Sequence, residues 1–238
     1  MNSEFGLMHL WAQGDIVTRI VFVILASMSV LSWCVIIIKG LGILRTQGQA
    51  KKVSGFWRSA DLDAALASLG QEGGNPFRIV AEEGREAAAH YRATTPQLHD
   101  SLDINDWIRS ALNHSIDNIT ARLQSGLVIL ASVGSTAPFV GLFGTVWGIY
   151  HALMSIGQAG QASIDKVAGP IGEALIMTGF GLAVAIPAVL GYNVLVRGNK
   201  AILGRLHRFA HDLHAFYITG ARVTAASVEG NIIRMKKA

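Results

Sequence analysis

Three long apolar runs constrain this chain more than any other feature of its sequence. The first, Ile20 to Ile38, has 19 residues, and a helix of that length rises about 28 Å, close to the roughly 30 Å of a bilayer core. No charged residue occurs between Arg122 and His151, or between Glu173 and Arg197. Each run is long enough to cross a membrane, so we expect an all-α membrane protein with three transmembrane helices.

The composition supports a membrane protein and argues against an enzyme. Charged residues make up 15% of the chain, against about 25% in soluble domains. Glycine is frequent, at 26 residues, which suits helices that pack backbone to backbone in lipid. The single cysteine, Cys34, cannot form a disulfide within the chain. We recognise no nucleophile–base set, phosphate loop or metal cluster, and expect no catalysis, cofactor or metal.

The distribution of positive charge predicts the orientation. Residues 39–125 hold ten Lys and Arg and residues 197–238 hold eight, whereas Arg19 and Lys166 are the only ones elsewhere. Because Lys and Arg accumulate on the cytoplasmic side, the N-terminus is expected to be periplasmic and the C-terminus cytoplasmic, in a bacterial inner membrane. A basic segment beside a membrane favours anionic lipids as partners, and we expect no nucleic acid.

These features divide the chain into seven segments. They are a periplasmic N-terminus (1–15), a first transmembrane helix (16–39), a cytoplasmic helical domain (40–125), a second transmembrane helix (126–153), a periplasmic loop (154–170), a third transmembrane helix (171–196) and a basic cytoplasmic C-terminal helix (197–238).

The cytoplasmic segments are predicted to be helical. Ser59 is a candidate N-cap for a helix ending at Leu69, and Pro76 opens another helix through about Tyr91. From Leu98 no strong helix breaker precedes the second span, so we expect one continuous helix there. In the C-terminal segment a helical stripe is formed by Ile202, Leu206, Phe209, Leu213 and Phe216.

Three histidines flank that stripe, namely His207, His211 and His214. At these spacings they could form a metal-binding face, or simply a polar border beside the apolar stripe. No acid or cysteine completes a ligand set, so we do not predict a metal site.

The second and third spans each carry a face of small residues. We predict close helix packing through Gly141, Gly144, Gly148, Gly181 and Ala185. Thr145 and Thr178 lie on the same two faces. Their hydroxyls could bond the carbonyl one turn back or line a narrow lumen. Glu173 could be an interfacial carboxylate at a helix N-terminus or could face an aqueous pathway.

Two segments carry a resemblance to a known family. Residues 141–149 read Gly-Leu-Phe-Gly-Thr-Val-Trp-Gly-Ile, and residues 172–175 read Gly-Glu-Ala-Leu, followed by Thr178 and by Ala-Ile-Pro-Ala-Val at 185–189. These motifs resemble the ExbB/TolQ/MotA family of ion-driven motor proteins, with a dense match over about 125–200. Residues 135–140 and 192–195 most resemble the ExbB branch.

The resemblance implies a mechanism for this chain. ExbB-like proteins form pentamers around transmembrane helices of a single-span ExbD-like partner. Inward proton flow drives a TonB-like protein that opens outer-membrane receptors for iron chelates and vitamin B12. By residue match, Thr145, Thr178 and Glu173 would line or border the pore. The alternatives are a TolQ-like subunit of the Tol–Pal envelope-integrity motor and a non-conducting membrane scaffold. Three spans without an inverted repeat argue against a self-contained transporter.

Overall fold

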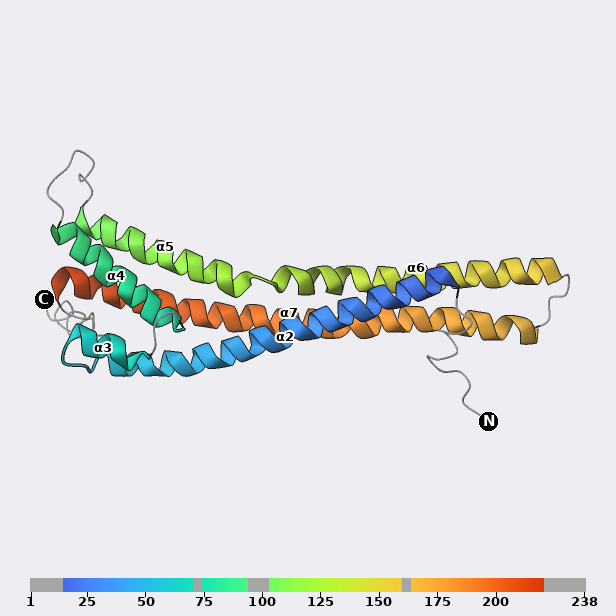
Figure 1. Ribbon diagram of the computed structural model, residues 1–238, viewed down its shortest axis with the longest axis horizontal. Coiled ribbons are helices and arrows are strands. Elements are labelled where there is room, and N and C mark those ends of the chain that lie inside the picture. The colour runs from blue at the N-terminus through green and yellow to red at the C-terminus, as the bar shows by residue number, and fades with distance from the viewer. Residues whose placement is uncertain (1–14, 71–73, 94–102, 160–163, 221–238) are drawn as a thin grey trace, which may run out of the picture. The chain divides into compact units, whose positions relative to one another are not determined.

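The computed structural model describes residues 15–70, 74–93, 103–159 and 164–220. Their regular structure is entirely helical, which confirms the predicted fold class in its coarse form (Figure 1). The helices are α2 (Ile16–Phe56), α3 (Leu62–Ser68), α4 (Pro76–Ala93), α5 (Ile104–Gln124), α6 (Leu127–Ala159) and α7 (Ile164–Thr219).

The chain divides into two compact units. Unit 1 comprises residues 1–40 and 126–196, and unit 2 comprises residues 41–125 and 197–238. The division falls within α2 and within α7, so each of these long helices contributes to both units.

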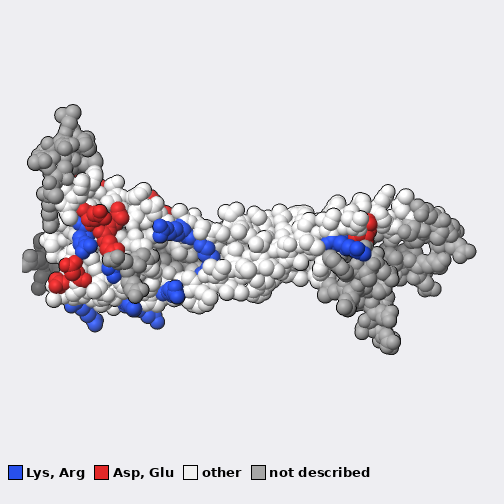
Figure 2. All heavy atoms as spheres, in the orientation of Figure 1, with Lys and Arg blue, Asp and Glu red and all other residues white. Residues whose placement is uncertain are grey.

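Unit 1 is built from α6 and the unit 1 portions of α2 and α7. Three helical stretches are long and apolar enough to cross a membrane, within Ile16–Phe56, Ile104–Met154 and Ala174–Thr219. Many large apolar side chains of unit 1 face outward, among them Ile38, Phe139 and Val194. The face of these helices shown in Figure 2 is almost free of charge. An outward apolar surface suits lipid, and the expected number of three candidate membrane-spanning helices is confirmed.

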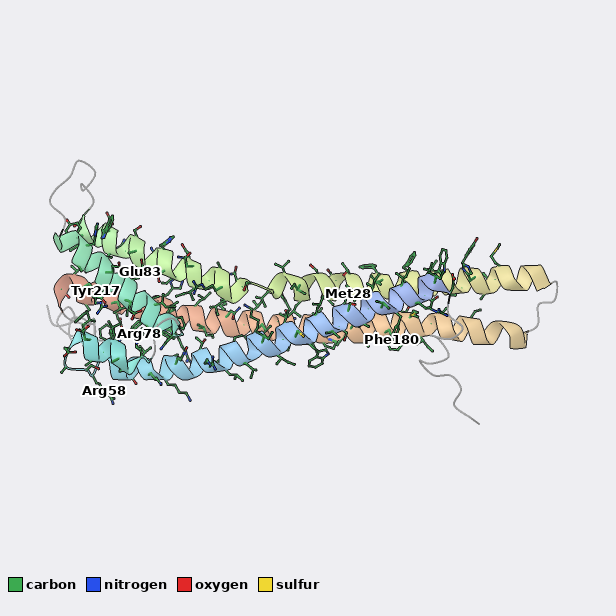
Figure 3. The ribbon with its side chains drawn as sticks, viewed as in Figure 1. Met28, Arg58, Arg78, Glu83, Phe180 and Tyr217 are labelled. Carbon is green, nitrogen blue, oxygen red and sulfur yellow. The ribbon has the colours of Figure 1, made fainter. Side chains whose placement is uncertain are left out.

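Unit 2 has a conventional apolar core. Phe209 of α7 lies at its centre, with edge-to-face ring contacts to Phe56 at 5.3 Å and Phe77 at 5.7 Å between centroids. Tyr217, labelled in Figure 3, donates a hydrogen bond of 2.8 Å to the carbonyl of Ala81 in α4. Burial raises the pKa of this phenol well above its ordinary value, so the hydroxyl keeps its proton. The predicted stripe on the C-terminal helix is confirmed, because Leu206, Phe209 and Leu213 belong to this core and Phe216 packs against it.

The expected continuous helix into the second span is wrong. α5 ends at Gln124 and α6 begins at Leu127, and Gly126 between them has a φ of +81°. Such a backbone favours glycine, the usual residue just past a helix end. The amide of Asn199 in α7 donates a 2.9 Å bond to the carbonyl of Leu123. One of the carbonyls left over at the end of α5 is thereby satisfied.

Three smaller expectations about helix ends also change. Asp61, not Ser59, caps α3, because its carboxylate accepts a 2.6 Å bond from the amide of Ala64. Helical structure continues through Ala159 and resumes at Ile164, so most of the predicted 154–170 loop is helical. The C-terminal helix ends at Thr219, and the rest of the predicted 197–238 helix lies outside the described residues.

Candidate functional site

The candidate site is the contact between α6 and α7 in unit 1. Gly141 and Gly181 meet backbone to backbone: a Cβ on Gly141 would lie 2.6 Å from the Met177 carbonyl oxygen and 3.0 Å from the Gly181 Cα. A Cβ on Gly181 would lie 2.7 Å from the Ala137 carbonyl oxygen. Only glycine fits this approach, since real Cβ atoms do not come so close to backbone atoms.

The neighbouring small residues extend the same contact. A Cβ on Gly148 would lie 2.8 Å from the Ala174 Cβ, and one on Gly144 would lie 3.0 Å from a methyl carbon of Val21 in α2. Ala185 is buried in unit 1. Four of the five predicted packing positions therefore meet another helix of the same chain at close range, and the fifth is buried.

The hydroxyl of Thr145 links α6 to α7 at the centre of this contact. Its Oγ1 lies 3.2 Å from the Gly141 carbonyl oxygen one turn back, 3.1 Å from the Ala174 carbonyl oxygen, and within hydrogen-bond distance of the Thr178 Oγ1. Thr145 is 6% exposed and Thr178 is half-buried. The two predicted hydroxyls are thus brought together, with Thr145 inside the helix pair and Thr178 nearer its surface.

Glu173 stands in α7, five residues before Thr178 and next to Ala174. Its side chain lies outside the described residues, so its two interpretations stay open.

A second polar cluster, not anticipated from the sequence, lies where α2 begins. The Asp15 carboxylate accepts hydrogen bonds from the Trp147 indole at 3.1 Å and from the Ile16 amide at 2.7 Å, and its Oδ2 lies 3.6 Å from the His151 Nε2. The rings of Trp147 and His151 pack with centroids 4.8 Å apart. The indole bond and then the amide bond hold the pKa of Asp15 below its ordinary value.

Part of this cluster could have been found in the sequence. Trp147 and His151 are four residues apart, so on a helix they share one face. The missing element was Asp15, which is 132 residues away from Trp147.

The three C-terminal histidines do not act as one group. His207 and His211 line a groove of about 660 Å³ together with Arg205 and Arg208, whereas His214 lies 3.2 Å from the Asn105 carbonyl oxygen. Among the described residues no three His, Cys, Asp or Glu side chains are placed to hold a metal ion.

Comparison with known proteins identifies the family. Residues 81–208, which include α5, α6 and most of α7, match the MotA/TolQ/ExbB proton channel family. The chain belongs to this family. It is therefore an integral membrane protein, and the α6–α7 contact lies within the part that matches the proton channel family.

Relatives within the MotA/TolQ/ExbB family favour the ExbB branch. The chain is 42% identical to the biopolymer transport protein ExbB of Xanthomonas campestris, over 93% of this chain and 92% of that protein. It is 42% identical to ExbB of Neisseria meningitidis, over 88% and 96%. The Tol-Pal system protein TolQ of Haemophilus influenzae is 34% identical, over 82% and 86%. These names are those of transport-system and Tol–Pal subunits and not of enzymes.

Proposed function

We propose that this chain is the ExbB-like scaffold subunit of an inner-membrane motor that uses the proton motive force to energise TonB-dependent uptake through the outer membrane. The observation that carries the proposal is its 42% identity to ExbB proteins over nearly the whole chain, against 34% to TolQ. Five copies surround transmembrane helices of an ExbD-like partner, and a TonB-like protein receives the motion.

The α6–α7 contact supplies a physical basis for the motor role. The Thr145 and Thr178 hydroxyls lie together among small residues, and hydroxyl and carbonyl oxygens at close quarters can line an ion path. In the proposed assembly the half-buried Thr178 hydroxyl borders the pore, and Thr145 holds it in place from inside the helix pair. Glu173 provides a carboxylate near the periplasmic end of the same helix.

Complementation tests the function and separates it from the TolQ alternative. The chain, expressed with its ExbD-like partner in cells lacking both ExbB and TolQ, should restore uptake of ferric siderophores and vitamin B12. It should leave envelope integrity, measured as detergent sensitivity, unrepaired. Repair of the envelope without uptake would assign the TolQ role. If the protein is inserted and binds its partner but restores neither uptake nor the envelope, it is a non-conducting scaffold.

Glu173→Ala tests the pathway within that assay. We expect it to abolish uptake while the protein stays inserted and oligomeric, with Glu173→Gln as the control for side-chain size. Near-normal uptake by both variants would support the interfacial interpretation of this carboxylate.

Labelling tests the proposed location and orientation. In a Cys34→Ala background, Ser163→Cys should react in whole cells with a membrane-impermeant thiol reagent, whereas Ser59→Cys should react only after the inner membrane is opened. The reverse pattern would overturn the orientation. Native mass spectrometry of the purified protein, with and without the ExbD-like partner, measures the expected pentamer.

A further inference from the structure

We propose that Asp15 and His151 form a proton-binding site at the start of α2, and that binding a proton there fastens α2 to α6. We call this pair, together with Trp147, the α2 clasp. The proposed orientation places the clasp at the periplasmic side. Proton binding by the clasp, and its attachment of α2 to α6, do not depend on that orientation. No residue of the clasp belongs to the α6–α7 contact described above.

Asp15 is the member of the clasp that stays negatively charged. Asp15 receives the Trp147 indole N–H at 3.1 Å and the Ile16 amide at 2.7 Å, and both bonds stabilise its ionised form. Arg19, one turn further along α2, acts in the same direction. These contacts keep the pKa of Asp15 below its ordinary value, so Asp15 remains negative throughout the pH range in which cells live.

The imidazole is the partner that carries a charge only when it is protonated. Its Nε2 lies 3.6 Å from the Asp15 Oδ2, which is long for a hydrogen bond but close for an ion pair. The pair is an attractive one only when His151 is protonated, and imidazoles as a class take up a proton between pH 5 and 8. Protonation of His151 therefore strengthens the clasp.

The other ionisable groups around the clasp are few in the described part of the chain. Arg19 approaches from α2, and Tyr150 packs against His151 from α6 with ring centroids 5.7 Å apart. In α7 the charged residues of the first turns are Asp165, Lys166 and Glu173, whose side chains lie outside the described residues.

The clasp matters because several contacts between α2 and the other two helices of unit 1 are apolar. Val21 approaches Gly144, Phe22 meets Phe180 edge to face at 5.6 Å between centroids, and Ile36 fills the space beside Gly191. Lipid tails are as apolar as these side chains, so lipid competes with such contacts on nearly equal terms. Lipid tails cannot replace the Asp15–His151 ion pair or the hydrogen bond from the Trp147 indole to Asp15.

Hydrogen–deuterium exchange at the start of α2 tests the clasp. The purified full chain in nanodiscs, without partner proteins, is exchanged at pH 8 and pH 5.5, and the rates are corrected for the intrinsic effect of pH. Backbone amides of residues 19–23 should be protected about two- to fivefold more strongly at pH 5.5, the range expected for a partly exposed ion pair. No flux or uptake is measured, so the outcome is independent of the proposed transport function.

Three variants separate the parts of the clasp. His151→Gln and Asp15→Asn keep hydrogen-bonding groups but remove one charge each, so both should abolish the pH dependence. Trp147→Phe keeps the ring and removes the indole donor, so protection should fall at both pH values while the pH dependence remains. Equal wild-type protection at the two pH values, or a pH dependence that survives in His151→Gln, would overturn the proposal.

Discussion

Adding one methyl group at the glycine crossing of α6 and α7 should cost a large part of the stability of this helix pair. In Gly141→Ala the new Cβ would lie 2.6 Å from the Met177 carbonyl oxygen, where ordinary contact begins near 3.4 Å. The backbone of Gly181, 3.0 Å away, cannot rotate aside as a side chain could. The helices must therefore separate by about 0.8 Å, and a gap of that size forfeits roughly a quarter to a half of each van der Waals contact.

The expected loss follows from two contributions. Overpacking of this kind costs about 1–3 kcal/mol. The bond from Thr145 to the Ala174 carbonyl, now 3.1 Å, would be stretched beyond hydrogen-bonding distance, which removes about 0.6 kcal/mol more by the average measured in membranes. We expect the free energy of unfolding of Gly141→Ala to fall by about 1.5–3.5 kcal/mol.

The assay is reversible unfolding in mixed micelles by SDS titration, followed by circular dichroism. Gly181→Ala should behave like Gly141→Ala, and the double variant should cost less than the sum, because the first methyl has already separated the helices. The matched control is Gly179→Ala, where a Cβ would meet no atom within 4 Å. If Gly141→Ala proved as stable as Gly179→Ala, the backbone contact would not hold the pair together.

Three further changes test other contacts. Thr145→Val keeps the volume and removes the hydroxyl, so stability should fall by about 0.5–2 kcal/mol in the same titration, and combining it with Thr178→Val should reduce siderophore uptake while the oligomer persists in native mass spectrometry. Tyr217→Phe should lower the unfolding free energy by about 0.5–1.5 kcal/mol, whereas Tyr91→Phe, at an exposed position, should change it little. Equal effects of the two substitutions would show that the hydrogen bond from Tyr217 to the Ala81 carbonyl does not stabilise the protein. Gly144→Leu should displace α2 and abolish oligomers, and intact oligomers would show that this face tolerates bulk.

The spans and their packing faces could be predicted because they depend on periodic patterns. The absence of charge between Arg122 and His151 is enough to identify a membrane helix, and the placement of Gly141 and Gly181 on small-residue stripes anticipates their contact. The same logic placed Leu206 and Leu213 on one apolar stripe, and both are fully buried in unit 2.

The elements missed depend on single backbone conformations or on distant partners. Gly126 looks like any other glycine of an apolar segment until its positive φ is seen, although glycine after a polar residue at a helix end is a recognised signal. Ser59 and Asp61 are both good N-cap residues, and choosing between them needs the position of the Ala64 amide. Each threonine hydroxyl was expected to bond its own turn or a lumen, and their meeting across 33 residues of sequence required the helix crossing.

The shallow packing of α2 has a consequence for how freely its sequence can vary. Only 17% of its most apolar window is buried, against 33% for each of the other two spans. Its buried positions in unit 1, Val21, Leu25 and Ser32, follow one narrow stripe. Within a single chain, most side chains in the unit 1 portion of α2 therefore face outward, and what is required of them is that they stay apolar. Apolar residues there should be interchangeable in a saturation mutagenesis library, and selection should fall on that stripe and on the two ends of the helix's unit 1 portion.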